Sequence, residues 1–356
     1  MNALLPRDAL ETLAVFHDER PGNPTVMRDG RVLVSMSAIG QPEYAVRAIR
    51  PDGSHRPYPD AVWAGRPRPD GRGMAGVIGI RADREDRIWM LDMGDADHQP
   101  KLVAWDDRAD RLHKVIVLPQ NVLRPSSFAQ DFVIDWRRRR IYIADMTMNA
   151  AGVSDFPAII VVDLDTGLSR RMLESHPALM PGDQPVVING KPLARRLEDG
   201  TLAEFRHGFN PIALDPVGRW VYVGALSGTS VYRIETAVLA DEMDDAVLGA
   251  ALHHWCDKPH CDGFDVDAAG NIYITDIENH AVGRASPDGY AMLVQDPDRL
   301  GWPDGVELDV EGRWLYVTAN QIHRLATLNH GVDESAPPYY VLRLRVDAPM
   351  SEGGRS

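Results

Sequence analysis

The chain has 356 residues, of which 44% are hydrophobic and 25% charged, which is the composition of a folded globular protein. Its net charge is −14, from 38 basic and 52 acidic residues, and this balance disfavours a nucleic acid or an anionic membrane as the partner. No stretch approaches the roughly 18 apolar residues that span a bilayer, so no membrane segment is predicted.

The N-terminal segment, MNALLPRDALETLAVF, does not read as a signal peptide because Arg7, Asp8 and Glu11 interrupt it. The chain has only two cysteines, Cys256 and Cys261, and so does not depend on an oxidising compartment for its fold. We therefore expect a cytoplasmic protein.

A hairpin phrase recurs along the whole chain. It consists of a short apolar stretch, Asp, turn residues and a second apolar stretch that carries Tyr or Trp, and alternating apolar residues on both sides of a turn predict a β-hairpin. The copies in chain order are NPTVMRDGRVLVSM from Asn23, which is degenerate, GIRADREDRIWMLD from Gly79, DFVIDWRRRRIYIAD from Asp131, NPIALDPVGRWVYVGA from Asn210, DGFDVDAAGNIYITD from Asp262 and DGVELDVEGRWLYVTA from Asp304.

A second pair of strand-like segments follows most copies, so each repeat is predicted to hold four antiparallel strands. Examples begin at Tyr44, Lys101, Ala158 and Ala281. Six such repeats predict an all-β fold, a six-bladed β-propeller that occupies residues 1–356 as a single domain. A late strand from Tyr339 and an N-terminal strand over Thr12–Phe16 are expected to meet in the last blade and close the ring, which removes exposed sheet edges.

Two insertions interrupt the repeat, at residues 174–206 and 236–260, and we expect both to form loops over one face. The second contains a helical candidate around residues 237–252. The basic run Arg137–Arg140 falls in a hairpin turn, where a solvated tip is the expected structure.

The residue that opens each inner strand is expected to point toward the axis of the ring. Across the copies this position holds Asn23, Ile78, Gln130, Asn210, Asp262 and Asp304. Five of the six side chains carry oxygen, the ligand atom that a hard cation such as Ca²⁺ prefers. The competing explanation is that Asn, Asp and Gly favour strand entries and turns.

Three segments resemble a known family: LDMG after Trp89, IYIADMT…AIIVVDLDTG from Ile141, and CDGFDVDAAGNIYITDIENHAV from Cys261. They are similar to the yellow/major royal jelly protein family and to its broader relatives, the senescence-marker-protein/gluconolactonase-like six-bladed propellers. The resemblance covers roughly Arg20 to Val346. It implies a site at the mouth of the central channel, where gluconolactonase-like members bind a divalent cation, often calcium, and hydrolyse lactones or related esters.

The same resemblance implies metal ligands. Asn210 in FNPIALDP and Asp262 in CDGFDVD match metal-binding positions of gluconolactonase-like proteins, and the first-blade Glu of that family is expected to fall on Asn23. The replacement of this Glu by Asn removes one negative charge, which leaves Asp262 and Asp304 as the anionic candidates.

Four residues are candidates for catalysis: Asp262, Asp304, His207 and His260. Asp262 can hold the cation and orient water, and the others can act as a general base near the mouth. For the histidines, a surface or packing role is the alternative. Gln130 is a candidate for substrate binding.

The stretch HHWCDKPHC from His253 has no standard zinc spacing. We therefore expect a loop beside the mouth, with Trp255 as an apolar wall for the substrate. The chain lacks a G-x-S-x-G elbow, so a serine nucleophile is not supported.

Two functions follow from these features. The first is a metal-dependent hydrolase of a lactone or small ester. The second is a non-hydrolytic propeller of the yellow/royal jelly group that binds or isomerises a small molecule, and the missing first-blade acid and Ile78 favour it. Both take a small-molecule partner.

Overall fold

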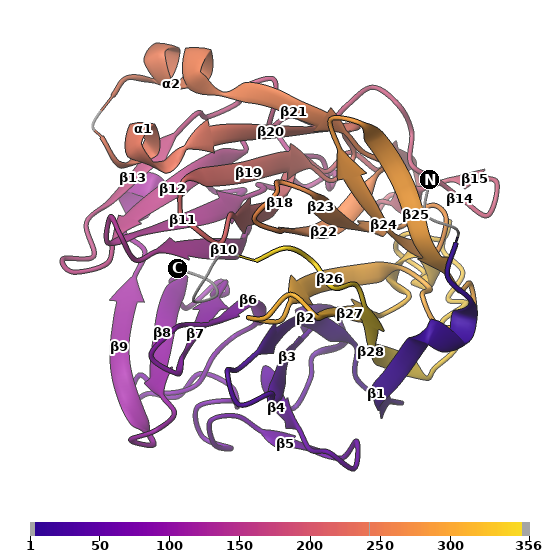
Figure 1. The fold of residues 1–356 in the computed structure, drawn as a ribbon, viewed down its shortest axis with the longest axis horizontal. Coiled ribbons are helices and arrows are strands. Elements are labelled where there is room, and N and C mark those ends of the chain that lie inside the picture. Colours follow the sequence, from indigo (N-terminus) through magenta and orange to yellow (C-terminus); the bar gives the residue numbers. More distant parts are fainter. Residues whose placement is uncertain (1–3, 242, 351–356) are drawn as a thin grey trace.

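The computed structural model describes residues 4–241 and 243–350 and shows six four-stranded antiparallel sheets arranged as blades around a central channel (Figure 1). The predicted six-bladed propeller is confirmed. Blades 1 to 3, from the innermost strand outward, are β2 (Pro21–Val26), β3 (Val32–Met36), β4 (Val46–Ile49) and β5 (His55–Pro57); β6 (Val77–Ala82), β7 (Arg87–Asp92), β8 (Lys101–Asp106) and β9 (Arg111–Val117); and β10 (Ala129–Asp135), β11 (Arg140–Asp145), β12 (Ala158–Asp163) and β13 (Ser169–Met172).

Blades 4 to 6 follow the same order. They are β18 (Phe209–Leu214), β19 (Trp220–Ala225), β20 (Ser230–Glu235) and β21 (His253–Asp257); β22 (Cys261–Val266), β23 (Ile272–Asp276), β24 (Ala281–Ser286) and β25 (Gly289–Gln295); and β26 (Pro303–Leu308), β27 (Trp314–Ala319), β28 (Tyr339–Arg345) and β1 (Leu10–Phe16). In the described residues, no helix has the length and apolar character needed to cross a membrane.

The N-terminal strand closes the ring, as the sequence predicts. β1 pairs antiparallel with β28 as the outermost strand of blade 6, so the two ends of the fold share one sheet. Phe16 at the end of β1 is 2% exposed and stacks on His55 of blade 1, with ring centroids 4.4 Å apart. The closing strand is therefore hydrogen-bonded within blade 6 and packs against blade 1 through Phe16.

The repeated hairpin phrase has a structural cause. Its Asp lies in the turn after an inner strand and accepts hydrogen bonds from the turn backbone and from the aromatic residue of the next strand. In blade 2, Asp83 accepts from the backbone N–H groups of Glu85 (2.7 Å) and Arg87 (3.0 Å) and from Nε1 of Trp89 (2.9 Å). The degenerate first copy has Met27 at this point, and there Asp29, in the exposed turn, binds the backbone of Arg31 instead.

We predict that Asp83→Ala lowers the free energy of unfolding by about 2–3 kcal/mol, because it leaves buried donors, the Trp89 indole N–H among them, without their acceptor. Asp29→Ala, in the matching turn of blade 1, is the control and is expected to cost less than about 1 kcal/mol because that side chain is exposed. Urea unfolding of both variants measures the difference. Equal costs would contradict the structural role of the repeated Asp.

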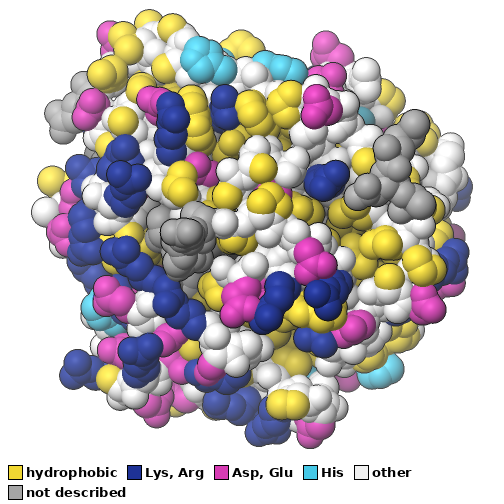
Figure 2. All heavy atoms as spheres, viewed as in Figure 1, with side chains coloured by type: hydrophobic (Ala, Val, Ile, Leu, Met, Phe, Trp, Pro, Cys, Tyr) yellow, Lys and Arg dark blue, Asp and Glu magenta, His cyan; other side chains and the backbone are white. Residues whose placement is uncertain are grey.

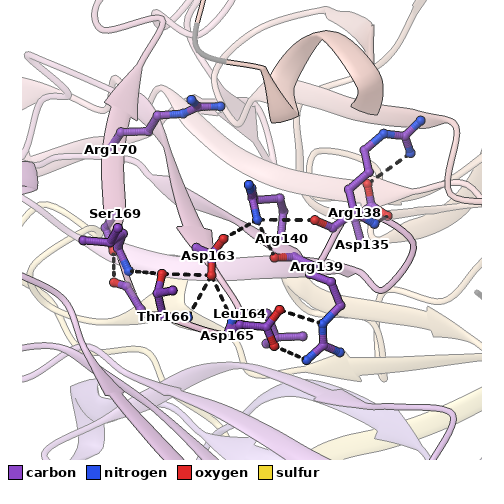
Figure 3. Close-up of polar contacts among 12 residues, drawn as sticks. Asp135, Arg138, Arg139, Arg140, Asp163, Leu164, Asp165, Thr166, Ser169 and Arg170 are labelled. Carbon is purple, nitrogen blue, oxygen red and sulfur yellow. Dashed lines mark hydrogen bonds and ion pairs between the residues drawn. The ribbon is translucent and has the colours of Figure 1, made fainter.

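The basic run Arg137–Arg140 forms the tip between β10 and β11, and Arg138, Arg139 and Arg140 pair with neighbouring acids (Figure 3). Arg138 lies 3.3 Å from Asp135, while Arg139 and Arg140 contact Asp165 and Asp163. Figure 2 shows basic and acidic side chains intermixed over the face in view. The run is thus an ion-paired hairpin tip.

The two insertions differ in structure. Residues 174–206 form two small hairpins, β14 (Val187–Ile188) with β15 (Lys191–Pro192) and β16 (Ala194–Arg196) with β17 (Leu202–Glu204). Residues 236–260 hold α1 (Thr236–Ala240) and α2 (Asp245–Ala251), which confirms the helical candidate. The prediction that the stretch from His253 forms a loop beside the mouth is wrong, because this stretch begins with β21, the outermost strand of blade 4.

Candidate functional site

A cavity of about 320 Å³ opens at one end of the central channel. Its floor is polar and its walls are mostly apolar, which is the usual character of a small-molecule site. The floor side chains come from the starts of the inner strands, and the walls include Phe128, Met146, Met148, Phe205, Leu226 and Ile322.

The floor positions are set by a common irregularity. In all six inner hairpins the register shifts immediately after the first paired residue, so a bulge turns the following residue toward the channel. The residues at this position are Gly22, Ile78, Gln130, Asn210, Asp262 and Asp304, and all six line the cavity.

The structure thus corrects one predicted ring residue. Asn23 lies one residue beyond the ring position of blade 1, which Gly22 occupies, and Asn23 is not among the residues that line the cavity. Its side chain lies instead against the backbone at Gly305 of blade 6. Blade 1 therefore contributes no side chain to the floor. The position at which the sequence predicts Asn in place of an acid is occupied by Gly22, which has no side chain.

Asp262 lies at the centre of the hydrogen-bonded floor. Asn210 donates from Nδ2 to one carboxylate oxygen of Asp262, and Trp302 donates from Nε1 to the other at 2.6 Å. Gln130 donates from Nε2 to the backbone oxygen of Asn210 at 2.9 Å and also contacts the Asn210 side chain. Three of the predicted residues, Gln130, Asn210 and Asp262, are therefore in one network.

Asp304 pairs with Asp262. The two carboxyl groups hydrogen-bond to each other, and Nδ2 of Asn320 donates to Asp304. Burial, followed by the charge of Asp262, raises the pKa of Asp304 well above its usual value. Burial also raises the pKa of Asp262, against the three hydrogen bonds that favour its charged form. Such a pair holds one proton between two carboxyl groups and titrates as a unit.

The two candidate histidines lie in different places. His207 lines the cavity, where its ring packs against Phe205 with centroids 4.0 Å apart. Burial, and then the charge of Arg195, lowers the pKa of His207 to about 4, so it is neutral at pH 7 and a weaker base than free histidine. His260 is buried outside the cavity lining, with Nδ1 3.0 Å from Oε2 of Glu278. His260 therefore does not face the substrate space.

The predicted location of Trp255, on the wall of the substrate cavity, is also wrong. It lies on β21, at the outer edge of blade 4, where Nε1 donates to the backbone oxygen of Gly270 at 2.9 Å and Arg233 stacks on its ring. It packs between blades, so it cannot form a wall of the substrate cavity. Cys256 on the same strand and Cys261 on β22 are free and buried.

Three residues of the site were not identified from the sequence. Trp302 and Asn320 bind the carboxyl pair, and Arg195 lines the cavity from the hairpin β16–β17. Trp302 and Asn320 do carry a local signal, since they lie just before β26 and just after β27, at the same end of blade 6 as Asp304. Arg195 carries none, because the inserted hairpin is outside the repeat.

The donor set fits a hard divalent cation in its chemistry: Asn210, Asp262 and Asp304 bring one amide and two carboxylate oxygens to one place. It differs from the predicted ligands Asn23, Asn210 and Asp262 in that Asp304 is present and Asn23 is absent. Across residues 4–241 and 243–350, no three His, Cys, Asp or Glu side chains gather as a metal-binding group. The Trp302 indole, which holds one oxygen of Asp262, is the kind of outer partner that orients a ligating carboxylate.

Comparison with known proteins supports the propeller fold and assigns the chain to a family. The family model described as "Major royal jelly protein" matches residues 75–351. No curated protein matches the chain in sequence.

Several solved structures share the fold. A gluconolactonase from Xanthomonas campestris is 14% identical, with a TM-score of 0.54, 94% of this chain covered and 88% of that one. A calcium-binding protein, regucalcin, from Agrobacterium tumefaciens is 14% identical, with a TM-score of 0.53 and coverages of 96% and 95%. A luciferin-regenerating enzyme is 12% identical, with a TM-score of 0.57 and coverages of 97% and 98%. At these identities the likeness shows the propeller fold alone.

Proposed function

The chain belongs to the major royal jelly protein family, and we propose that it is a hydrolase of a small lactone or ester. The observation that carries the proposal is the hydrogen-bonded pair Asp262–Asp304 on the floor of an apolar cavity. Structural neighbours that are named as gluconolactonases support the same class of substrate. We also propose that the protein is cytoplasmic, in line with its two free thiols.

The pair supplies an acid and a base in one place. Ionised Asp262, held by Asn210 and Trp302, takes a proton from water as the water oxygen bonds to the carbonyl carbon. The carbon–oxygen bond of the lactone then breaks, and the departing alkoxide takes the proton of Asp304. The product is a hydroxy acid, and the hydrogen bond between the two carboxyl groups returns the proton from Asp262 to Asp304.

The proposal extends to a divalent cation that takes the place of the shared proton, with Asn210, Asp262 and Asp304 as the residues that would hold it. When bound, such a cation supplies a Lewis acid that polarises the carbonyl group. Because it competes with a proton, its affinity is expected to rise with pH until both carboxyl groups are ionised.

We predict that purified protein opens γ- and δ-lactones, and that calcium raises the melting temperature more at pH 8 than at pH 6. A pH-stat assay on a lactone panel and a calcium titration of thermal unfolding, with elemental analysis, measure both. If the protein contains no metal and calcium causes no thermal shift at either pH, the proposed cation site is refuted, while the acid–base proposal for Asp262 and Asp304 stands. Lactones that stabilise the protein without being opened would contradict hydrolysis and favour the non-hydrolytic binding protein.

A further inference from the structure

The substrate cavity has a cationic side chain on its wall that the reaction above does not use. Arg195 extends from β16, part of the insertion 174–206, and is partly buried among the cavity-lining residues. Its side chain packs across Gly152, and Nη1 lies 3.4 Å from Sδ of Met148. These contacts fix the guanidinium at the wall.

Among the described residues, Arg195 has no acidic partner, whereas several other partly buried arginines do. Arg81 pairs with Asp131 at 2.9 Å, and Arg171 contacts Asp145 and Glu174. Within the part of the chain that the structure describes, no carboxylate lies within ion-pair distance of Arg195. A partly desolvated guanidinium without an anion is the usual recognition group for a carboxylate, which it binds through two parallel hydrogen bonds.

The charge of Arg195 is felt inside the cavity, since it is one cause of the lowered pKa of His207. The remaining titratable groups of the cavity lining are Asp262 and Asp304 on the floor. The cavity therefore has a cation on the wall, an acid–base pair at the floor and apolar side chains such as Met146 and Leu226 in the rest of its lining.

We propose that the substrate of this cavity is an acidic lactone or ester, whose apolar body separates the reacting carbonyl group from a carboxylate that Arg195 binds. The inference rests on the proposed function for the reacting group, but the carboxylate site stands on the geometry of Arg195. Arg195 is thus a residue that determines specificity, supplied by the inserted hairpin rather than by the repeat.

The binding test uses hexanoate, its uncharged analogue hexanamide, and hexylamine as probes of thermal stability. Wild-type protein is expected to bind hexanoate about tenfold more tightly than hexanamide, and Arg195→Met is expected to abolish this preference while Arg195→Lys keeps part of it. Arg196→Met is the matched control, because the next side chain on the same hairpin is exposed and lies over Gly331. Equal binding of hexanoate and hexanamide, or preferred binding of hexylamine at the carboxyl pair, would overturn the proposal.

The kinetic test separates this inference from the proposed function. For a lactone that bears a terminal carboxylate, Arg195→Met is expected to raise KM about tenfold with kcat little changed, and to leave KM for the matching carboxamide lactone unaltered. Equal KM changes for both lactones would overturn the role of Arg195. If wild-type protein opens neither lactone yet prefers hexanoate through Arg195, the hydrolase is wrong and the carboxylate site stands.

Discussion

Asp304→Asn is expected to lower kcat for lactone opening by about 10²–10⁴-fold, because it removes the proton that the leaving alkoxide needs. The substitution keeps the shape of the side chain and its contact with Asn320, so the cavity should stay intact. Steady-state kinetics on the best lactone of the panel measures the loss. Asp288→Asn, in the exposed turn between β24 and β25, is the control and should leave kcat unchanged.

The wild-type protein is expected to show a bell-shaped dependence of kcat on pH. In the wild type the active pair holds one proton, so activity falls at low pH, where both carboxyl groups are protonated, and at high pH, where both are ionised. Because the pKa values of both groups are raised, the whole bell lies above the range of free Asp.

The raised pKa of Asp304 also affects stability. The contribution of Asp304 to the free energy of unfolding is fully present below its pKa in the unfolded chain, about 3.8. This contribution is lost as the pH rises through the higher pKa that Asp304 has in the folded protein. Asp304→Asn should remove this loss, so its melting temperature at pH 8 should equal or exceed that of the wild type. An inactive variant that is also less stable at pH 8 would show a structural role for Asp304 instead.

Phe16→Ala is expected to lower the free energy of unfolding by about 3–5 kcal/mol, the usual cost of emptying a buried aromatic site. Phe16 belongs to a cluster that includes Val34 of blade 1 and Val341 of blade 6. Its loss therefore weakens the joint that closes the ring, where the N-terminal strand β1 pairs with the distant strand β28.

Urea unfolding measures the effect, with Glu11→Ala as the control on the same strand. Glu11 pairs with Arg343 of β28 at 2.7 Å, but both side chains are partly exposed, so its removal should cost at most about 1 kcal/mol. If the two variants were equally stable, the ring would be closed by strand pairing alone, and the packing of Phe16 would not contribute.

The local pattern of the sequence was enough to predict the propeller. Each copy of the phrase folds on itself, since Asp83 and its counterparts bind their own turn and the next strand within a few residues. The closing strand was predictable for a different reason: the last repeat lacks a fourth strand, and the N-terminal segment contains a strand that can complete it.

The site was predictable only where it follows the repeat. Gln130, Asn210, Asp262 and Asp304 share one position in the inner hairpins, and the structure brings all four to the floor. Asn23 was wrong by one residue, because a bulge decides which residue of an irregular strand start faces the channel. Trp255 was wrong because a segment rich in His and Cys turned out to be an edge strand.

By itself, the sequence determined the number of blades, their strands and the ring of candidate side chains, because those depend on short-range alternation and turns. Only the tertiary structure decided that Asp262 and Asp304 lie together in a buried place that raises the pKa of both, and that Trp302 and Asn320 hold them. It also decided that Arg195 lies on the cavity wall with no acidic partner among the described residues. These properties depend on burial and on contacts between different blades and the inserted hairpin, which no local pattern records.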